Sequence, residues 1–383
     1  MTRPIPENPL RYTPDVEDIS PDEPQLAEAL ADTMLSISYK THADSAHAIR
    51  AVHAKSHGLL SAEVEIFEDL PPQLAQGLFA NPGTYEAILR LSTTPGDILH
   101  DSVSAPRGMA LKILDVDGER LPGSERSRSQ DFVMVNGKVF NSPSGEAFLG
   151  SLKLLSATTD RVEGTKKLLS KVLRGIEGAL ETVGRESTTL KVMGGQPLTH
   201  MLGESFFTQV PVRYGDYIAK LGVVPASDNL KALIDQSVDV ANDPETFRHL
   251  VEEFFETETA VWHLQVQLAT DLQSTPVEEP MTPWDEDKSP YITVATITAG
   301  PQTAWSEERS RQVDDGMKFS PWNGLVAHQP LGQIMRLRKL AYTRSAAFRS
   351  ERNPTAVTEP ITCPFASTTP ASVVEETGAR VFP

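Results

Sequence analysis

The sequence predicts an α+β protein in which short β-strands form a sheet or barrel and helices pack outside it. Apolar and acidic residues alternate in "AEVEIFEDL", from Ala62 to Leu70, as in a strand with one buried face. Similar short runs follow in "YEAILRLST" and "GMALKILDV". Longer segments have a helical period, so we expect both kinds of element.

The amino-terminal segment is rich in proline and acidic residues, which is typical of an extended arm. From Gln25 to His53 the periodicity predicts a helix followed by a connection. No internal repeat is evident. We therefore expect an arm at 1–24, a single barrel domain with helical insertions at 25–360, and a tail at 361–383.

Further helices and strands are expected along the domain. The segment Thr159 to Gly184 has its apolar residues on one helical face, which predicts an amphipathic helix inserted between strands. In "DPETFRHLVEEFFE" we expect a helix with Asp243 as N-cap and Pro244 at its first position. After Met317 a loop should lead into a basic helix. More strands are predicted in "SFFTQVPVRYG", "AVWHLQVQLATDL" and "YITVATITAG".

Charge and composition exclude several classes of function. The 383-residue chain has a formal net charge of −17, which argues against a nucleic-acid partner and favours a small-molecule one. The single cysteine, Cys363, excludes an internal disulfide and a multi-cysteine metal site, and it indicates a reducing compartment. Neither a signal peptide nor a run of about 18 apolar residues is evident, so we expect a cytoplasmic protein without a membrane span.

Two histidines, His53 and His57, lie four residues apart in "RAVHAKSHG". On a helix they could hold a metal, but Ala54 stands where the zinc-protease pattern has a glutamate. Gly58 and the strand pattern downstream also argue against a helix. A lone histidine is more often structural, so spacing alone leaves both roles open.

A basic segment near the carboxyl end bears on this choice. "RLRKLAYTRSAAFR", from Arg336 to Arg349, has five basic residues and no acidic one in a strongly acidic chain. Such a run either faces solvent or neutralises an anion. Arg338 and Tyr342 share one helical face at i, i+4, where the guanidinium favours the phenolate form of the tyrosine. A phenolate can bind ferric haem iron, whereas a neutral tyrosine is a poor ligand.

Several motifs together resemble the haem catalases, in the same order and at similar separations. The resemblance runs from about Ile49 to Pro360. It is carried by "RAVHAK" from Arg50, "LRLSTTPGD" from Leu89, "APRGMALKI" from Ala105, "FSPWN" from Phe319, "R-x-x-x-Y" from Arg338 to Tyr342, and "SERNPTAVTEP" from Ser350. It implies an antiparallel β-barrel of the haem catalase type that encloses ferric haem b, with helices outside.

The resemblance also implies roles for individual residues. His53 matches the distal catalytic histidine, Ser92 the serine bonded to it, and Tyr342 the axial ligand of the iron, with Arg338 beside it. The propionate-binding arginines are matched by Arg50, Arg90 and Arg349, since guanidinium groups pair well with carboxylates. His57 has no counterpart and is expected at the surface.

Some positions depart from the family pattern. In "SRSQDFVMVNG", Arg128, Ser129 and Gln130 stand where the family pattern places the distal asparagine, and Gln130 is a substitute to consider. Val133 and Met134 replace two aromatic residues, and we expect them to widen an apolar entrance. Ala105 replaces an aspartate and Ala346 a histidine, whereas Val52 before the catalytic histidine follows true catalases rather than allene oxide synthases. Because the sequence ends soon after Pro360, we expect the carboxyl-terminal helical region to be largely absent, and predict no bound dinucleotide.

These features predict a haem-dependent oxidoreductase that consumes peroxides. Without the distal asparagine, we expect organic or fatty-acid hydroperoxides to be preferred, with weak dismutation of hydrogen peroxide. The alternatives are an ordinary catalase, a non-catalytic haem-binding protein or peroxide sensor, and an acidic β-barrel interaction module. The short arm and the missing region predict a homo-oligomer, with a dimer favoured.

Overall fold

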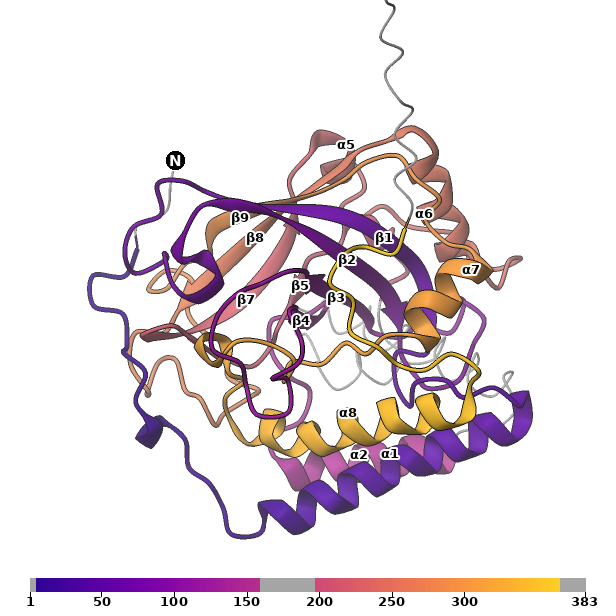
Figure 1. Ribbon diagram of the computed structural model, residues 1–383, viewed down its shortest axis with the longest axis horizontal. Helices are drawn as coiled ribbons and strands as arrows, with labels where there is room; N and C mark the ends of the chain where they lie inside the picture. Colours follow the sequence, from indigo (N-terminus) through magenta and orange to yellow (C-terminus); the bar gives the residue numbers. More distant parts are fainter. Residues whose placement is uncertain (1–4, 159–196, 366–383) are drawn as a thin grey trace, which may run out of the picture.

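A nine-stranded antiparallel sheet forms the centre of the computed structural model, which describes residues 5–158 and 197–365 (Figure 1). The strand order is β5-β4-β3-β2-β1-β9-β8-β7-β6. Because β5 also pairs with β7, the eight strands other than β6 close into a barrel. The strands are β1 (Lys55–Ile66), β2 (Gly83–Thr93), β3 (Arg107–Ile113), β4 (Gln130–Val135), β5 (Phe206–Phe207), β6 (Val212–Tyr214), β7 (Tyr217–Pro225), β8 (Ala260–Leu268) and β9 (Ile292–Ala299).

The strands predicted from sequence are confirmed, although β1 is longer than its alternating pattern. The alternation at 62–66 places Ala62, Val64 and Ile66 in the core, with Glu63 and Glu65 exposed. The strand begins earlier, at Lys55, where every residue as far as Leu60 is buried. Both faces are covered there, so the first half lacks the period of two that marks a half-exposed strand.

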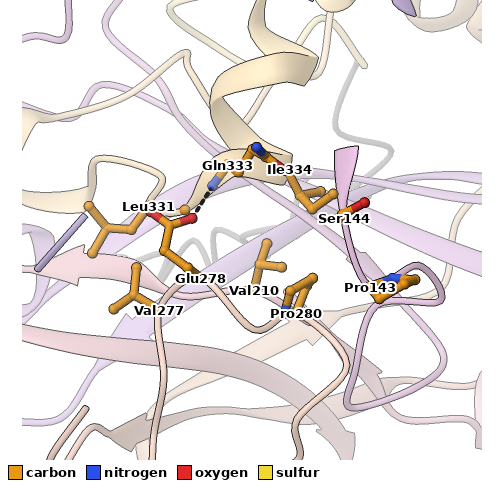
Figure 2. A pocket seen from close by; sticks show the side chains of 10 residues that line it. Pro143, Ser144, Val210, Val277, Glu278, Pro280, Leu331, Gln333 and Ile334 are labelled. Carbon is orange, nitrogen blue, oxygen red and sulfur yellow. Dashed lines mark hydrogen bonds between the residues drawn. The ribbon is translucent and has the colours of Figure 1, made fainter. Parts of the chain in front are cut away.

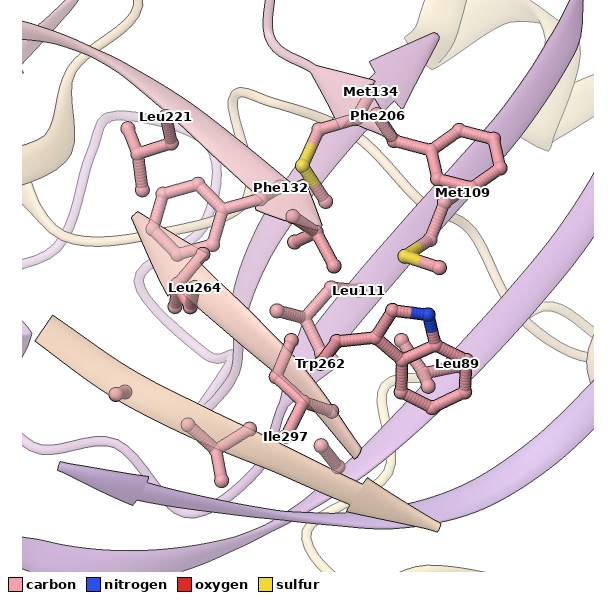
Figure 3. Packing of buried hydrophobic residues seen from close by; sticks show 14 of the residues in the cluster. Leu89, Met109, Leu111, Phe132, Met134, Phe206, Leu221, Trp262, Leu264 and Ile297 are labelled. Atoms are coloured by element: carbon pink, nitrogen blue, oxygen red, sulfur yellow. The ribbon is translucent and has the colours of Figure 1, made fainter. Parts of the chain in front are cut away.

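The interior of the barrel is filled with side chains. Trp262 at its centre has no exposed surface, and leucine, methionine and phenylalanine residues from β2, β3, β4 and β8 surround it (Figure 3). A core packed in this way leaves no room for a cofactor. The expectation that the barrel itself encloses haem is therefore wrong, and the large cavity described below lies outside the barrel.

Three long helices pack together on one side of the barrel (Figure 1). Leu30 of α1, Leu149 of α2 and Leu337 of α8 meet in a buried apolar cluster. In the described ranges the α-helices are α1 (Glu23–Ser45), α2 (Gly145–Thr158), α5 (Asp228–Lys231), α6 (Thr246–Thr257), α7 (Glu307–Ser310) and α8 (Gln333–Arg352). None of them is both long and apolar enough to span a bilayer.

Two helix predictions need comment. Asp243 is not an N-cap, because α6 begins only at Thr246, after Glu245. The Asp243 carboxylate instead accepts from the Glu245 N–H at 2.9 Å in a local turn, which delays the helix. The amphipathic helix expected at Thr159 to Gly184 lies outside the described residues.

The amino-terminal segment lies along the barrel before α1 begins. Arg11 forms an antiparallel bridge with Tyr217, and Val16 is buried against Ile218 and Trp284. Helix α1 then starts at Glu23, two residues before the predicted position.

Candidate active site

The position of α8 is fixed at its amino terminus by acidic side chains. A Glu278 carboxylate oxygen accepts from the Gln333 N–H at 2.7 Å (Figure 2), as a negative group at a helix start should. Arg336, one turn on, pairs with Glu278, Glu17 and Glu23. These contacts tie the helix to the barrel loops and to the amino-terminal segment.

Four arginines of α8 divide into two groups. Arg336 and Arg344 pair with acidic residues, the latter with Asp32 and Glu28 of α1, so they hold the helices together. Arg338 and Arg349 instead line a cavity. The basic segment therefore has two roles. Part of it pairs with acidic residues of the protein, and part of it lines the cavity.

The cavity has a volume of about 500 Å³ and lies between the barrel and the helices. The barrel wall includes His53, Val133 and Val135, and the helix wall includes Arg338 and Tyr342. Residues from α1, α2 and the loop after β4 complete the lining, among them Met34, Phe140, Phe148 and Leu152.

The alternation of β4 decides which of its side chains reach the cavity. Val133 and Val135 point outward into it, whereas Met134 is 1% exposed in the barrel core. The expectation that Met134 widens the cavity is therefore wrong. Gln130 is also fully buried, and its Oε1 accepts from the Leu325 N–H, so it does not replace a distal amide.

Sequence reasoning missed an asparagine that does line the cavity. Asn136 follows the last residue of β4, whereas the family pattern places its distal asparagine before this strand. Its Oδ1 accepts from the Arg107 N–H at 2.8 Å and its Nδ2 donates to Glu204 at 2.6 Å. The Asn-Gly pair at 136–137 is a turn signal that could have placed it at a strand end.

His53 is held on the barrel wall in an uncommon backbone conformation. Its φ of 53° lies in the left-handed region, which costs about 1–3 kcal/mol for a residue other than glycine. The imidazole Nδ1 lies 3.2 Å from Ser92 Oγ. Gly108 pairs with Ser92 in the sheet, and a Cβ there would lie 2.7 Å from the His53 ring, so glycine is required for the close approach.

The electrostatic environment keeps His53 neutral. Burial, together with the positive charges of Arg90 and Arg338, lowers its pKa from 6.5 to about 3. Since Nδ1 is engaged with Ser92, Nε2 is the nitrogen left to exchange a proton with a molecule in the cavity. His53 thus has the charge state and position of a proton acceptor.

Arg338 and Tyr342 form a close pair on the helix wall. Arg338 Nη2 donates to the Tyr342 hydroxyl oxygen at 2.6 Å, as their spacing predicted, and both residues line the cavity. A charged donor stabilises negative charge on that oxygen. This is the arrangement required of a phenolate metal ligand.

The remaining predicted residues lie around these two pairs. Arg50 and Arg349 line the cavity, whereas Arg90 and Ser92 are buried behind its wall at 3% and 4% exposure. His57 is not at the surface as expected. It is fully buried in β1, 3.0 Å from Thr93 Oγ1 and edge-on to Phe247.

His53 and His57 do not share a helical face. His57 belongs to β1, which carries a bulge between Ser56 and Gly58, and His53 precedes the strand. In the part of the chain that the structure describes, no three His, Cys, Asp or Glu side chains are grouped to hold a metal ion.

The cavity residues fit a haem group. A porphyrin supplies four iron ligands itself, so the protein needs one axial ligand, which the Tyr342 oxygen can provide. The lining is largely apolar, with valine and phenylalanine residues, and it contains cationic groups for carboxylates. Among the described residues the buried Arg349 Nε has no hydrogen-bond partner, so one donor is left for a bound anion.

Comparisons with known proteins identify the fold. No protein-family model and no curated protein matches the sequence. Solved structures do match. Catalase A from Saccharomyces cerevisiae has a TM-score of 0.56, and a fungal and a bacterial catalase each have 0.54. Each is 15% identical, over 84%, 87% and 91% of this chain respectively.

These matches cover 65%, 68% and 67% of the three catalases, so the chain spans about two thirds of their length. The chain therefore has a catalase-like fold, as the motifs indicated. At 15% identity the likeness establishes the architecture only.

Proposed function

We propose that the protein is a haem-dependent oxidoreductase that consumes peroxides. One observation carries the proposal, namely that a single cavity has the Arg338–Tyr342 pair on its helix wall and His53, held from behind by Ser92, on its barrel wall. A site that only bound haem would need the first pair but not a positioned neutral histidine. The catalase-like fold supports the same class of reaction.

Each pair has a distinct task in this proposal. Haem b would supply the redox chemistry when bound. Tyr342 would hold its iron, and the Arg338 guanidinium stabilises negative charge on the phenol oxygen. His53 would take the proton of a peroxide at Nε2 and return it to the departing oxygen, while Ser92 fixes the orientation of the ring through Nδ1.

We further propose that organic hydroperoxides, including those of fatty acids, are better substrates than hydrogen peroxide. The barrel wall that carries His53 presents Val133 and Val135 to the cavity. The cavity asparagine, Asn136, is already bonded to Arg107 and Glu204 through its amide. An alkyl tail gains about 0.8 kcal/mol per buried methylene, so apolar walls can position a large peroxide without help from an amide.

The test is reconstitution with ferric haem b followed by steady-state assays. We expect a Soret band and a higher kcat/KM for cumene or fatty-acid hydroperoxide than for hydrogen peroxide. Rapid oxygen evolution from hydrogen peroxide, with no reaction of the larger peroxides, would instead identify an ordinary catalase. A haem protein that consumes no peroxide would be a binding protein or sensor, and absence of a Soret band would refute the haem site.

A further inference from the structure

A buried carboxylate, Asp314, lies among the arginines behind the cavity. Its side chain is 14% exposed and belongs to a short π-helical turn at Arg311–Asp315. One oxygen accepts from Arg90 Nε at 2.7 Å and from Arg50 Nη1 at 3.1 Å. The other accepts from the hydroxyls of Ser56 and Ser310, at 2.7 and 2.9 Å. Asp314 thus pairs with two guanidinium groups at once.

Further donors of these two arginines go to backbone carbonyls. Arg50 Nη1 also donates to the Asp314 carbonyl, and Nη2 donates to the carbonyls of Val313 and Met317 at 3.1 and 3.0 Å. Arg90 Nη2 donates to the Ala54 carbonyl at 3.1 Å. Both terminal nitrogens of Arg50 are therefore committed to the segment that precedes Phe319, and Arg90 does not reach the cavity wall.

Arg349 differs from both. It lines the cavity and is only 3% exposed, and no described carboxylate oxygen lies within 4 Å of its guanidinium. Nη2 donates to the Met317 carbonyl at 2.9 Å, Nη1 makes only long contacts with Ser345, and Nε has no partner. Burial and the charge of Arg90 lower the pKa of Arg349 to about 10, although the charges of Asp314 and Asp315, which do not contact it, act in the opposite direction.

The other cationic side chains of the cavity wall have partners of their own. Lys138 pairs with Glu286, Lys318 lies 3.7 Å from Glu359, and Arg338 donates to Tyr342. Arg349 is thus the buried cation whose charge a carboxylate entering the cavity would compensate most.

We propose that Asp314 withdraws Arg50 and Arg90 from ligand binding and leaves the recognition of a carboxylate in the cavity to Arg349. This division rests on the proposed function, and it differs from the sequence-based expectation that all three arginines bind propionates. The carboxylate belongs either to haem b or to a fatty-acid hydroperoxide. In both cases Arg349 is the binding group, and Asp314 acts by positioning its neighbours.

The test compares ligands with free and esterified carboxylates on the full chain. The dissociation constants of ferric haem b and its dimethyl ester give one ratio, and the KM values of a fatty-acid hydroperoxide and its methyl ester give a second. For the wild type we expect one of these two ratios to favour the free acid by about 10- to 100-fold. This is the usual range for the loss of a hydrogen bond to a charged group. The ratio that shows the effect identifies the source of the carboxylate.

Arg349→Met should bring that ratio close to one, whereas Arg50→Met should leave it near the wild-type value even if it lowers stability. Arg344→Met, on the same helix but paired with α1, is the matched control. Asp314→Asn keeps the shape but removes the negative charge, so the ratio should rise as Arg50, which lines the cavity, becomes available to the ligand. A purely structural Asp314 would change stability and leave the ratio unchanged.

Three results would overturn the inference. In the first, the ratio falls equally in the Arg50 and Arg349 variants. In the second, it stays unchanged in Arg349→Met. In both cases haem still binds, so the inference fails but the proposed function stands. If neither haem b nor its ester binds the wild type, both the inference and the proposed function are wrong.

Discussion

The two walls of the cavity are built in different ways. The helix wall takes Arg338, Tyr342 and Arg349 from one continuous segment, α8. On the barrel wall, His53 precedes β1 and is held by Ser92 of β2 and Gly108 of β3. Helical spacing alone aligns the first set, whereas the second depends on the register of a three-stranded sheet.

The walls also differ in charge. The helix wall presents cations and a phenol, which suit the binding of a metal and of carboxylates. The barrel wall presents valine side chains and a histidine that its surroundings keep neutral, which suits proton transfer. If this contrast is correct, substitutions should separate haem binding from turnover according to the wall they alter.

The largest effect is expected on the helix wall, from Tyr342→Phe. The change removes the oxygen that would bind iron and leaves the ring, so haem content should fall more than about tenfold and activity with it. Absorbance of the reconstituted protein measures this. Tyr39→Phe, at an exposed tyrosine of α1, is the control. An unchanged haem content and spectrum in Tyr342→Phe would show that the helix wall does not provide the ligand.

On the barrel wall, His53→Ala should have the opposite profile. Haem content should remain, because His53 is not needed for binding, but kcat/KM for every peroxide should fall by about 10²- to 10⁴-fold. His249→Ala, at an exposed histidine, should behave as the wild type. Loss of haem from His53→Ala would contradict the separation of the two walls.

The same contrast explains what the sequence could predict. The Arg338–Tyr342 pair depends on a local i, i+4 relation, and its geometry follows from the spacing. Motif resemblance brought His53 and Ser92 together, but periodicity could not have done so, because they are 39 residues apart. Met134 was misplaced because the face to which each β4 residue points depends on its register with β3.

Asp314 and His57 could not be placed from sequence for a related reason. The acidic pair at 314–315 has no distinctive spacing, and its arginine partners are more than 200 positions away. His57 was expected at the surface because it has no counterpart in the family pattern. The segment before Ala62 shows no alternation that would have marked it as a strand, yet that part of β1 is buried on both faces. Long-range contacts, rather than local pattern, determine both environments.

A smaller effect on turnover should come from Gly108→Ala. Its Cβ would lie 2.7 Å from the His53 ring, so the imidazole must shift and the proton-transfer geometry should deteriorate. We expect kcat/KM to fall by about 10- to 100-fold with haem content retained. Gly150→Ala in α2, where a Cβ meets nothing within 4 Å, is the matched control. Full activity in Gly108→Ala would mean that this contact does not position His53.

The smallest expected effect is on stability. It tests whether a lowered histidine pKa is found only at the barrel wall of the cavity. His328 is 1% exposed, accepts from the Leu78 N–H, and lies away from the cavity lining. Burial nevertheless lowers its pKa to about 3, as it does for His53. The shift alone therefore does not mark a site. Contact with the cavity and with Ser92 distinguishes His53.

For His328, the unfolded chain takes up a proton near pH 6.5, but the folded chain does so only near pH 3. Between these values the unfolded state binds more protons, so stability should fall as the pH drops, by up to about 1.4 kcal/mol per pH unit. His328→Gln keeps an acceptor for Leu78 without this titration, and should reduce the slope of unfolding free energy against pH by about one proton. Urea denaturation between about pH 5 and 6.5 measures it, with His249→Gln as control. An unchanged slope would mean that His328 is not held neutral by its surroundings.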